Sequence, residues 1–402
     1  MHFPLFPIPD TIPPSMTHQQ KQNLGLFFGA IVVIGGLYWA YGAYQNKQIA
    51  DSSWPTLDGG VYASAVTRGD VTSLIPGDQL YDSGVVESGI PALTNPKYAS
   101  VLASDAVIAD DLMGISLEID GQHRYYPVQI MNWHEVVNDT IGGKDVAITY
   151  CPLCGTGIVY SRHVDFEAPD ALSPNSVITL SATGQVYNNN TILKDAESGS
   201  LWIQALGKAI QGDAIGAELT VIPSQMMDWR TWKSLYPSGS VLSTDTGISR
   251  DYTRHPYGNY DTSKGLYFPI NHTSGDFTSK WVTYGVTDGT NGLAFSSLAL
   301  SGTGMMTAKL DDVPVMAVYD FDTETVRVYD WSGMNGSPKF TYEFAKQRLV
   351  DESGGIWNID GKATSGSYKG AQLSELGAVR GYWFCLAAMH PTWKAVTVSE
   401  TN

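Results

Sequence analysis

The sequence predicts an α+β protein that is rich in β-strands, with two related lobes and a single N-terminal transmembrane helix. Its 41 glycines and 22 tyrosines indicate many tight turns and half-buried strands. One pattern of helix, turn and strand occurs twice along the chain, which indicates an internal repeat. One uncharged segment near the N-terminus is long enough to cross a lipid bilayer.

Residues 1–21 form a proline-rich tail whose repeated prolines prevent a continuous helix. The run "LGLFFGAIVVIGGLYWAYGAY", from Leu24 to Tyr44, carries no charge and predicts a transmembrane helix over residues 22–44. At about 1.5 Å per residue, it spans a hydrocarbon core of about 30 Å. A cleaved signal peptide is the alternative, but its apolar core is normally shorter. The side chains expected to anchor the helix in lipid are Leu24, Phe27, Phe28, Ile31, Ile34 and Trp39.

The charge distribution predicts the membrane topology and excludes one class of binding partner. Lys21 precedes the membrane helix and Lys47 follows it, so the flanking lysines give little orientation. A short tail before a large acidic body favours a single-pass protein with a cytoplasmic N-terminus and a periplasmic or extracellular body. The net charge of -16 argues against a nucleic-acid partner, because binding phosphates needs a basic surface.

After the membrane helix we expect a linker with loops at 45–104, a first lobe at 105–280, and a second lobe with the C-terminal segment at 281–402. The segment that begins at Tyr126 aligns without gaps with the segment that begins at Phe295. Each contains a short apolar helix, a two-residue turn and an alternating strand. The second segment has Asp320 where the first has Cys151, so we expect any chemistry to lie in the first lobe.

The stretch "HEVVNDTIGGKDVAITYCPLC" brings one histidine close in sequence to two of the three cysteines of the chain. Pro127 suits the first turn of a helix, which we expect to continue to Asn138 with His134 on the same face as Asn138. A glycine turn then leads into the alternating strand "KDVAITY". This strand delivers Cys151 and Cys154, a CxxC motif, to the same corner as the histidine.

Thiolates and an imidazole that meet in this way suit copper or zinc. The C-terminal run "YWFCLAAMHP" offers further soft ligands in Cys385, Met389 and His390, which favours copper. The expected metal ligands are His134, Cys151, Cys154 and His390. Two other interpretations remain open, because Cys151 and Cys154 are also able to form a redox-active disulfide or to pack as small buried side chains.

Evidence for catalysis is weaker. In "HEVVN", Asn138 stands where zinc proteases have a second histidine, so a metalloprotease is not expected. Glu135 is a candidate general base, but a solvated carboxylate on a helix surface is the preferred interpretation. The sequence contains no P-loop, dinucleotide fingerprint or GxSxG motif. We therefore assign no catalytic residue and do not expect an enzyme.

Other motifs favour structural roles. Asp228 in "DWRTWKSLYP" is expected to cap a helix, and Trp229 and Trp232 are expected to pack on one of its faces. Trp202 is expected in the core. His255 in "RHPYGNYD" is expected in an exposed loop.

The successive blocks "YYPVQIMNWHEVVNDTIGGKDVAITYCPLCGTGIVY", "DAESGSLWIQALGKAIQG", "MMDWRTWKSLYPSGSVLS", "RDYTRHPYGNYD" and "WFCLAAMHP" resemble the DUF3179 family over about residues 105–395. The family has no assigned function, so the resemblance implies a fold unit more than an activity. The residues it places in the family motifs are Trp133, His134, Glu135, Asn138, Asp139, Cys151, Pro152, Cys154, Gly155, Trp202 and His390. Met389 replaces the usual aromatic residue and Cys385 is unusual, which weakens a ligand role for the C-terminal run.

Two functions follow from these observations. The first is a membrane-anchored accessory subunit that braces a larger respiratory, photosynthetic or transport complex through its transmembrane helix and N-terminal tail. The second is an extracytoplasmic copper- or zinc-binding protein, or a thiol-redox protein, centred on His134, Cys151 and Cys154.

Overall fold

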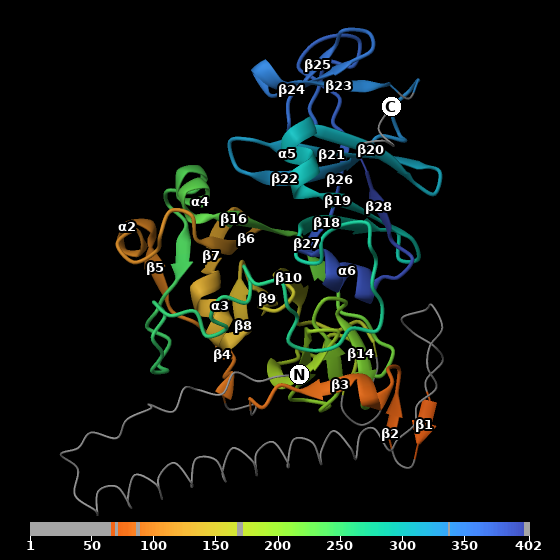
Figure 1. Ribbon diagram of the computed structural model, residues 1–402. Helices are drawn as coiled ribbons and strands as arrows, with labels where there is room; N and C mark the ends of the chain where they lie inside the picture. Colours follow the sequence, from red (N-terminus) through yellow and green to blue (C-terminus); the bar gives the residue numbers. More distant parts are fainter. Residues whose placement is uncertain (1–65, 69–70, 86–88, 167–171, 337, 398–402) are drawn as a thin grey trace, which may run out of the picture. The chain divides into compact units, whose positions relative to one another are not determined.

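The computed structural model describes residues 66–68, 71–85, 89–166, 172–336 and 338–397. The predicted tail, the transmembrane helix and its six anchoring side chains lie outside these residues. Within the described ranges, no helix combines the length and the apolar character that crossing a membrane requires. Strands dominate the described chain, which confirms the β-rich fold class (Figure 1).

The described helices are all short. They are α2 (Val101–Ser104), α3 (Val128–His134), α4 (Trp229–Leu235), α5 (Ser297–Thr303) and α6 (Trp383–Met389), with the 3-10 helices η1 (Gly77–Gln79) and η3 (Phe344–Lys346).

The strands before residue 243 form three sheets. One has the order β16 (Ser224–Asp228), β6 (Met113–Ile119), β7 (Gln122–Pro127), β17 (Ser240–Leu242), β5 (Tyr98–Ser100). The second has the order β15 (Val221–Ile222), β10 (Thr156–Ser161), β9 (Lys144–Cys151), β8 (Val136–Ile141), β4 (Leu93–Thr94). The third has the order β1 (Val66–Arg68), β2 (Val71–Ser73), β14 (Lys208–Gln211), β13 (Leu201–Ile203), β12 (Asn190–Asp195), β11 (Leu180–Tyr187), β3 (Leu80–Asp82).

The strands after residue 281 form three further sheets. One has the order β27 (Val379–Tyr382), β18 (Val282–Thr287), β19 (Gly292–Ser296), β28 (Lys394–Val396). The next has the order β20 (Met305–Leu310), β21 (Val313–Asp320), β22 (Thr325–Asp330), β26 (Ser374–Leu376). The last has the order β23 (Phe340–Glu343), β24 (Arg348–Asp351), β25 (Ile356–Trp357).

The two sets of sheets have matching connections. In the run β16–β6–β7–β17, the first two neighbouring pairs are antiparallel and the last pair is parallel. The run β27–β18–β19–β28 has the same order of strand directions. A seven-residue helix follows the second central strand in both, α3 after β7 and α5 after β19. A second seven-residue helix, α4 or α6, connects the outer strands. The same local order of strands and helices therefore occurs twice.

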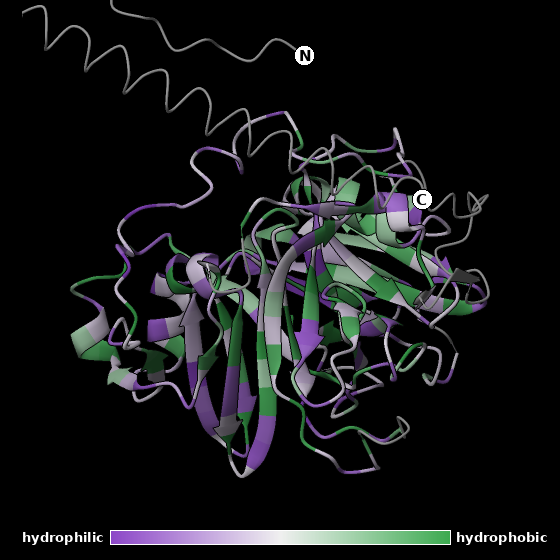
Figure 2. Ribbon diagram, turned by 90° about the horizontal axis from the view of Figure 1, so that it is seen from below, coloured by the Kyte–Doolittle hydropathy of each residue, from purple (hydrophilic) through white to green (hydrophobic). Residues whose placement is uncertain are grey.

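Tryptophans fill the interior of the first set of sheets. Trp202, Trp229 and Trp232 are fully buried, as the sequence predicts. Asp228 caps α4 by accepting a hydrogen bond from the Thr231 N–H at 2.7 Å, also as predicted. Figure 2 shows hydrophobic bands along the strands, with hydrophilic stretches at hairpin ends and in loops.

The helix that carries His134 ends earlier than the sequence predicts. α3 stops at His134 because Glu135 takes the left-handed conformation, with φ 56° and ψ -26°. The following Val136 and Val137 are β-branched, and they enter β8, which pairs with β9. Asn138 is therefore on a strand, and the prediction that it shares a helix face with His134 is wrong.

Candidate functional site

The CxxC motif lies in the tight turn between β9 and β10. Cys151 ends β9 opposite Thr156, the first residue of β10. Gly155 closes the turn with φ 63°, and its N–H donates to the Cys151 carbonyl at 2.8 Å. A Cβ atom at Gly155 would lie 3.1 Å from the Tyr382 ring. Both the backbone conformation and the limited space therefore favour glycine at this position.

The second cysteine of the motif is joined to the C-terminal helix. Cys154 forms a disulfide with Cys385 of α6, 231 residues away in sequence. The Tyr382 N–H, just before α6, donates to the Cys154 carbonyl at 2.8 Å. Cys151 is a buried free thiol and packs in the same apolar cluster as the bonded pair. A disulfide within the CxxC motif, one of the alternatives from the sequence, is therefore not the bond present in the structure.

The Cys151 thiol is surrounded by polar groups despite its burial. Its Sγ donates to the Asn189 carbonyl at 3.4 Å. The hydroxyl and the backbone N–H of Thr191, and the backbone N–H of Cys154, lie near Sγ and favour its thiolate form. Burial, followed by the nearby Glu135 carboxylate, raises the pKa of Cys151 to about 11. The thiol is therefore protonated at neutral pH, with three donors in place to stabilise a thiolate.

Three consecutive asparagines shape the loop that presents Thr191. Asn188 and Asn189 have φ values of 50° and 62°, a left-handed conformation that asparagine tolerates. The Asn189 amide exchanges two hydrogen bonds with the Phe268 backbone, at 2.8 and 2.9 Å. Asn190 accepts from the Ala205 N–H at 2.8 Å. These hydrogen bonds fix the turn of the β11–β12 hairpin just before Thr191.

Glu135 lies on the other side of Thr191. Its side chain is buried, at 3% exposure, which contradicts the predicted solvated carboxylate. Thr191 Oγ1 donates to Oε2 at 2.8 Å, and the Tyr257 hydroxyl donates to Oε1 at 2.6 Å. Burial raises the pKa of Glu135 to about 7, although both hydrogen bonds oppose this shift. The carboxyl therefore exchanges a proton near neutral pH, which is the property that a general base needs.

Thr191 connects the carboxyl to the thiol. Its hydroxyl donates to Glu135 Oε2 at 2.8 Å, while the thiol donates to the Asn189 carbonyl, two residues before Thr191. We call the group formed by Cys151, Cys154, Cys385, Thr191 and Glu135 the cysteine site. Its geometry permits a proton to pass from the thiol to the carboxyl through one hydroxyl.

A buried tyrosine, Tyr260, lies in the same cluster as the cysteines. Tyr260 is 1% exposed and belongs to the same apolar cluster as the three cysteines. Its hydroxyl has no hydrogen-bond partner among the described residues. Burial, and then the charge of a Cys151 thiolate, raises the pKa of Tyr260, so this phenol stays protonated. Its hydroxyl is a buried donor in the cluster that contains the thiol.

His134 forms its side-chain hydrogen bonds with residues outside the cysteine site. Its ring nitrogens pair with the Pro91 carbonyl and the Tyr252 hydroxyl, each at 2.7 Å. The Tyr252 hydroxyl also pairs with Thr246 Oγ1 at 2.7 Å. Burial lowers the pKa of His134, so the ring is neutral at pH 7. Both ring nitrogens are engaged in these hydrogen bonds, and neither partner is a cysteine.

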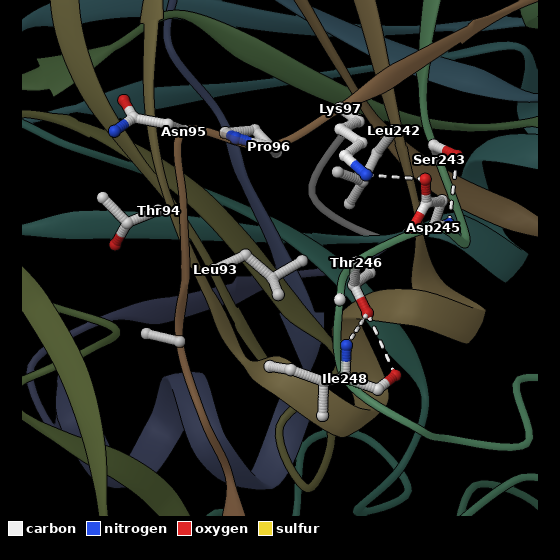
Figure 3. Close-up of a pocket in the computed structure, with 12 residues that line it drawn as sticks. Leu93, Thr94, Asn95, Pro96, Lys97, Leu242, Ser243, Asp245, Thr246 and Ile248 are labelled. Atoms are coloured by element: carbon white, nitrogen blue, oxygen red, sulfur yellow. Dashed lines mark hydrogen bonds and ion pairs between the residues drawn. The ribbon is translucent and has the colours of Figure 1, made fainter.

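Thr246 lies on the wall of a pocket of about 280 Å³ between β4 and the loop after β17 (Figure 3). Leu93 forms an apolar part of the pocket wall. Lys97 and Asp245 form an ion pair on another part of the wall, with 2.7 Å between the charged atoms. His134 is therefore connected through two hydroxyls to this pocket rather than to the cysteines.

The fourth predicted metal ligand is also engaged elsewhere. His390 follows α6 and stacks on Trp393, with ring centroids 3.9 Å apart. Burial lowers the pKa of His390 to about 4. In the described part of the chain, no group of three or more His, Cys, Asp or Glu side chains is placed to hold a metal ion. Of the four expected metal ligands, the structure brings Cys151 and Cys154 into one cluster, with Cys154 bonded to Cys385, and places the two histidines against other residues. Copper or zinc binding stays a prediction.

Thr191 and Tyr257 were not identified from the sequence as site residues. The signal for Thr191 is the run Asn188–Asn190, which is typical of a left-handed turn at a hairpin. Tyr257 lies in a loop, where the sequence pattern does not predict which residues a side chain contacts. His255, two residues before it, is exposed as predicted.

Comparison with known proteins gives one match. A family model described as "Protein of unknown function (DUF3179)" matches residues 87–393. No curated protein and no solved structure matches the chain.

Proposed function

Because the chain belongs to the DUF3179 family, whose description assigns no activity, we propose from the geometry of the cysteine site that the protein is a thiol–disulfide redox protein. The observation that carries this proposal is the meeting of all three cysteines of the chain in one cluster, two bonded and one free. A disulfide that is only structural needs neither a third thiol beside it nor a carboxyl with a pKa near 7 one hydroxyl away.

The reaction is the oxidation of a dithiol. One thiolate of the substrate attacks a sulfur of the Cys154–Cys385 bond, and the other sulfur of that bond leaves as a thiolate. The second substrate thiol then attacks the mixed disulfide. The substrate becomes a disulfide, and Cys154 and Cys385 become two thiols. Both cysteines are fully buried, so this reaction requires α6 to move away from the β9–β10 turn.

The repeated topology supports an assignment of the chemistry to the first set of sheets. We attribute the two sets to an internal duplication, in which Gly304 after α5 corresponds to Glu135 after α3, both left-handed. Asp320, which ends β21, corresponds to Cys151, which ends β9. The second set lacks the thiol and the carboxyl at these positions but supplies α6, which carries Cys385.

A redox titration tests the proposal. The native full-length protein is equilibrated in glutathione buffers from oxidising to reducing, its thiols are alkylated, and its peptides are mapped by mass spectrometry. We expect Cys154 and Cys385 to be reduced and reoxidised reversibly while the circular dichroism spectrum stays native. A disulfide that opens only when the protein unfolds would show a structural bond and contradict the proposal.

A membrane anchor is compatible with this function and stays a second proposal. It is supported by the uncharged run from Leu24 to Tyr44 and would hold the body in an oxidising compartment, where disulfides persist. Purification in mild detergent tests it together with the accessory-subunit hypothesis. Membrane association and copurifying partners are expected to be lost when residues 1–44 are deleted, and a monomer free of membrane would contradict both.

A further inference from the structure

We infer that Cys151 attacks the Cys154–Cys385 disulfide from within, with Thr191 and Glu135 accepting its proton, so that the bond moves to Cys151–Cys154 and Cys385 is released. This inference rests on the proposed redox function and adds the internal nucleophile and its base. It also assigns a conformational consequence, because Cys385 is the covalent link between α6 and the β9–β10 turn.

The position of the Cys151 thiol is the first observation that supports this attack. Cys151 ends β9 and Cys154 lies in the turn that leads to β10, so one tight turn carries both the free sulfur and one of the bonded sulfurs. Gly155 tightens the same turn with its hydrogen bond to the Cys151 carbonyl. The three cysteines share one apolar cluster, in which water does not compete for the thiolate.

A route for the proton of the Cys151 thiol is the second observation. A buried thiol must lose its proton before it attacks, and the protein interior offers few acceptors. Thr191 Oγ1 donates to Glu135 Oε2 at 2.8 Å, and Cys151 Sγ lies against the same hairpin, where it donates to the Asn189 carbonyl at 3.4 Å. The backbone N–H groups of Thr191 and Cys154 are the nearby donors that favour the thiolate.

The step is balanced without an external oxidant. The Cys151 proton passes to the Thr191 oxygen while the Thr191 proton passes to Glu135. Cys151 Sγ forms a bond to Cys154 Sγ, the Cys154–Cys385 bond breaks, and its electron pair leaves on Cys385 Sγ. That thiolate takes the proton back from Glu135 or from solvent. One disulfide and one thiol are present before and after.

The exchange would give the site a second redox form. With Cys385 free, α6 is held to the first set of sheets only by noncovalent contacts such as the hydrogen bond from Tyr382 to Cys154. Cys385 then becomes the thiol that meets an external disulfide or thiol, and the substrate class is a thiol or disulfide that reaches the face covered by α6.

Trapping in the unmodified protein tests the exchange. The native, oxidised full-length chain is incubated with iodoacetamide without added thiol, and its peptides are mapped without reduction. Because alkylation removes free Cys385 from the equilibrium, we expect carbamidomethylated Cys385 together with a Cys151–Cys154 disulfide. Label on Cys151 with the Cys154–Cys385 bond intact, or no label in the folded protein, would overturn the inference.

Variants test the base separately. The rate of Cys385 labelling is expected to level off above about pH 7 in the wild type, because the proton is then transferred internally. In Glu135→Gln the rate should keep rising tenfold per pH unit up to pH 9, since the thiol must ionise to solvent. Thr191→Val should slow labelling roughly a hundredfold, whereas Thr191→Ser, which keeps the hydroxyl, should not. Identical pH profiles in the wild type and Glu135→Gln would remove Glu135 from the mechanism.

The two proposals fail in different ways. If glutathione reduces the Cys154–Cys385 bond reversibly but iodoacetamide labels only Cys151, the redox function stands and the internal attack is wrong. If the bond resists glutathione in the folded protein while Cys385 is still trapped, the exchange occurs and the proposed reaction with external thiols is wrong.

Discussion

The Thr191 hydroxyl donates to Glu135 at 2.8 Å, and this carboxyl is held in the interior by hydroxyl groups, with Tyr257 on its other oxygen. Two neutral donors replace water only in part, so the ionised form of Glu135 remains costly. The carboxyl therefore connects the stability of the fold to the chemistry of the cysteine site.

The first prediction concerns stability against pH. The pKa of Glu135 is raised from 4.5 in the unfolded chain to about 7, so its contribution is complete below pH 4.5 and is lost as pH rises through 7. The loss is on the order of 3 kcal/mol. Urea unfolding between pH 4.5 and 7.5 should show this slope in the wild type. Glu135→Gln, which is neutral throughout, should lack it; equal slopes would mean that Glu135 titrates normally.

The second prediction concerns the disulfide. Cys385→Ser opens a loop of 231 residues, and we expect a loss of about 2–5 kcal/mol in the free energy of unfolding. Cys151→Ala removes a buried sulfur without opening a loop, so it should cost only about 1–2 kcal/mol. Guanidinium unfolding of both variants measures the difference. Equal losses would show that the bond adds little beyond packing.

The third prediction concerns the glycine of the CxxC turn. Gly155→Ala must accept φ 63° and a contact of 3.1 Å with the Tyr382 ring. Gly121→Ala has φ 75° but nothing within 4 Å, so it reports the backbone strain alone, about 1–2 kcal/mol. We expect Gly155→Ala to lose more than this and to disturb the position of α6. Thermal unfolding of the pair checks this, and equal losses would mean that the Tyr382 ring moves aside freely.

Local pattern predicted much of the fold. The alternation in "KDVAITY" gives β9, and the two glycines before it give its turn, because strand and turn signals depend on neighbouring residues. The end of α3 was missed because a left-handed Glu135 has no sequence signature, and a helix of seven residues is too short for periodicity to locate its end.

Long-range contacts explain what was missed in the site. The sequence marked Cys151 and Cys154 but had no means to place Cys385 beside them, since 231 residues separate the bonded pair. Glu135 looked like a solvated carboxylate because its burial depends on Tyr257 and Thr191, which come from two other segments. The hydrogen-bond partners of His134, Pro91 and Tyr252, are likewise distant in sequence, so local pattern did not predict them.

The last prediction tests the correspondence between the two sets of sheets. Trp202 Nε1 donates to Asp195 at 2.8 Å, and Trp357 Nε1 donates to Asp351 at 2.9 Å. In each case the other carboxylate oxygen accepts from a backbone N–H of the following turn. Replacing either aspartate by asparagine removes one acceptor and leaves a buried donor unpaired, at a cost of about 1–3 kcal/mol.

If the two sets of sheets arose by duplication, as proposed above, equivalent positions should lose similar amounts of stability. We therefore expect Asp195→Asn and Asp351→Asn to agree within about 1 kcal/mol, with a change in tryptophan fluorescence in both. Asp213→Asn, at an exposed position, is the matched control and should stay within about 0.5 kcal/mol of the wild type. A large loss at one aspartate and none at the other would show that the two tryptophan contacts are not equivalent, because only a shared local structure imposes the same requirement on both.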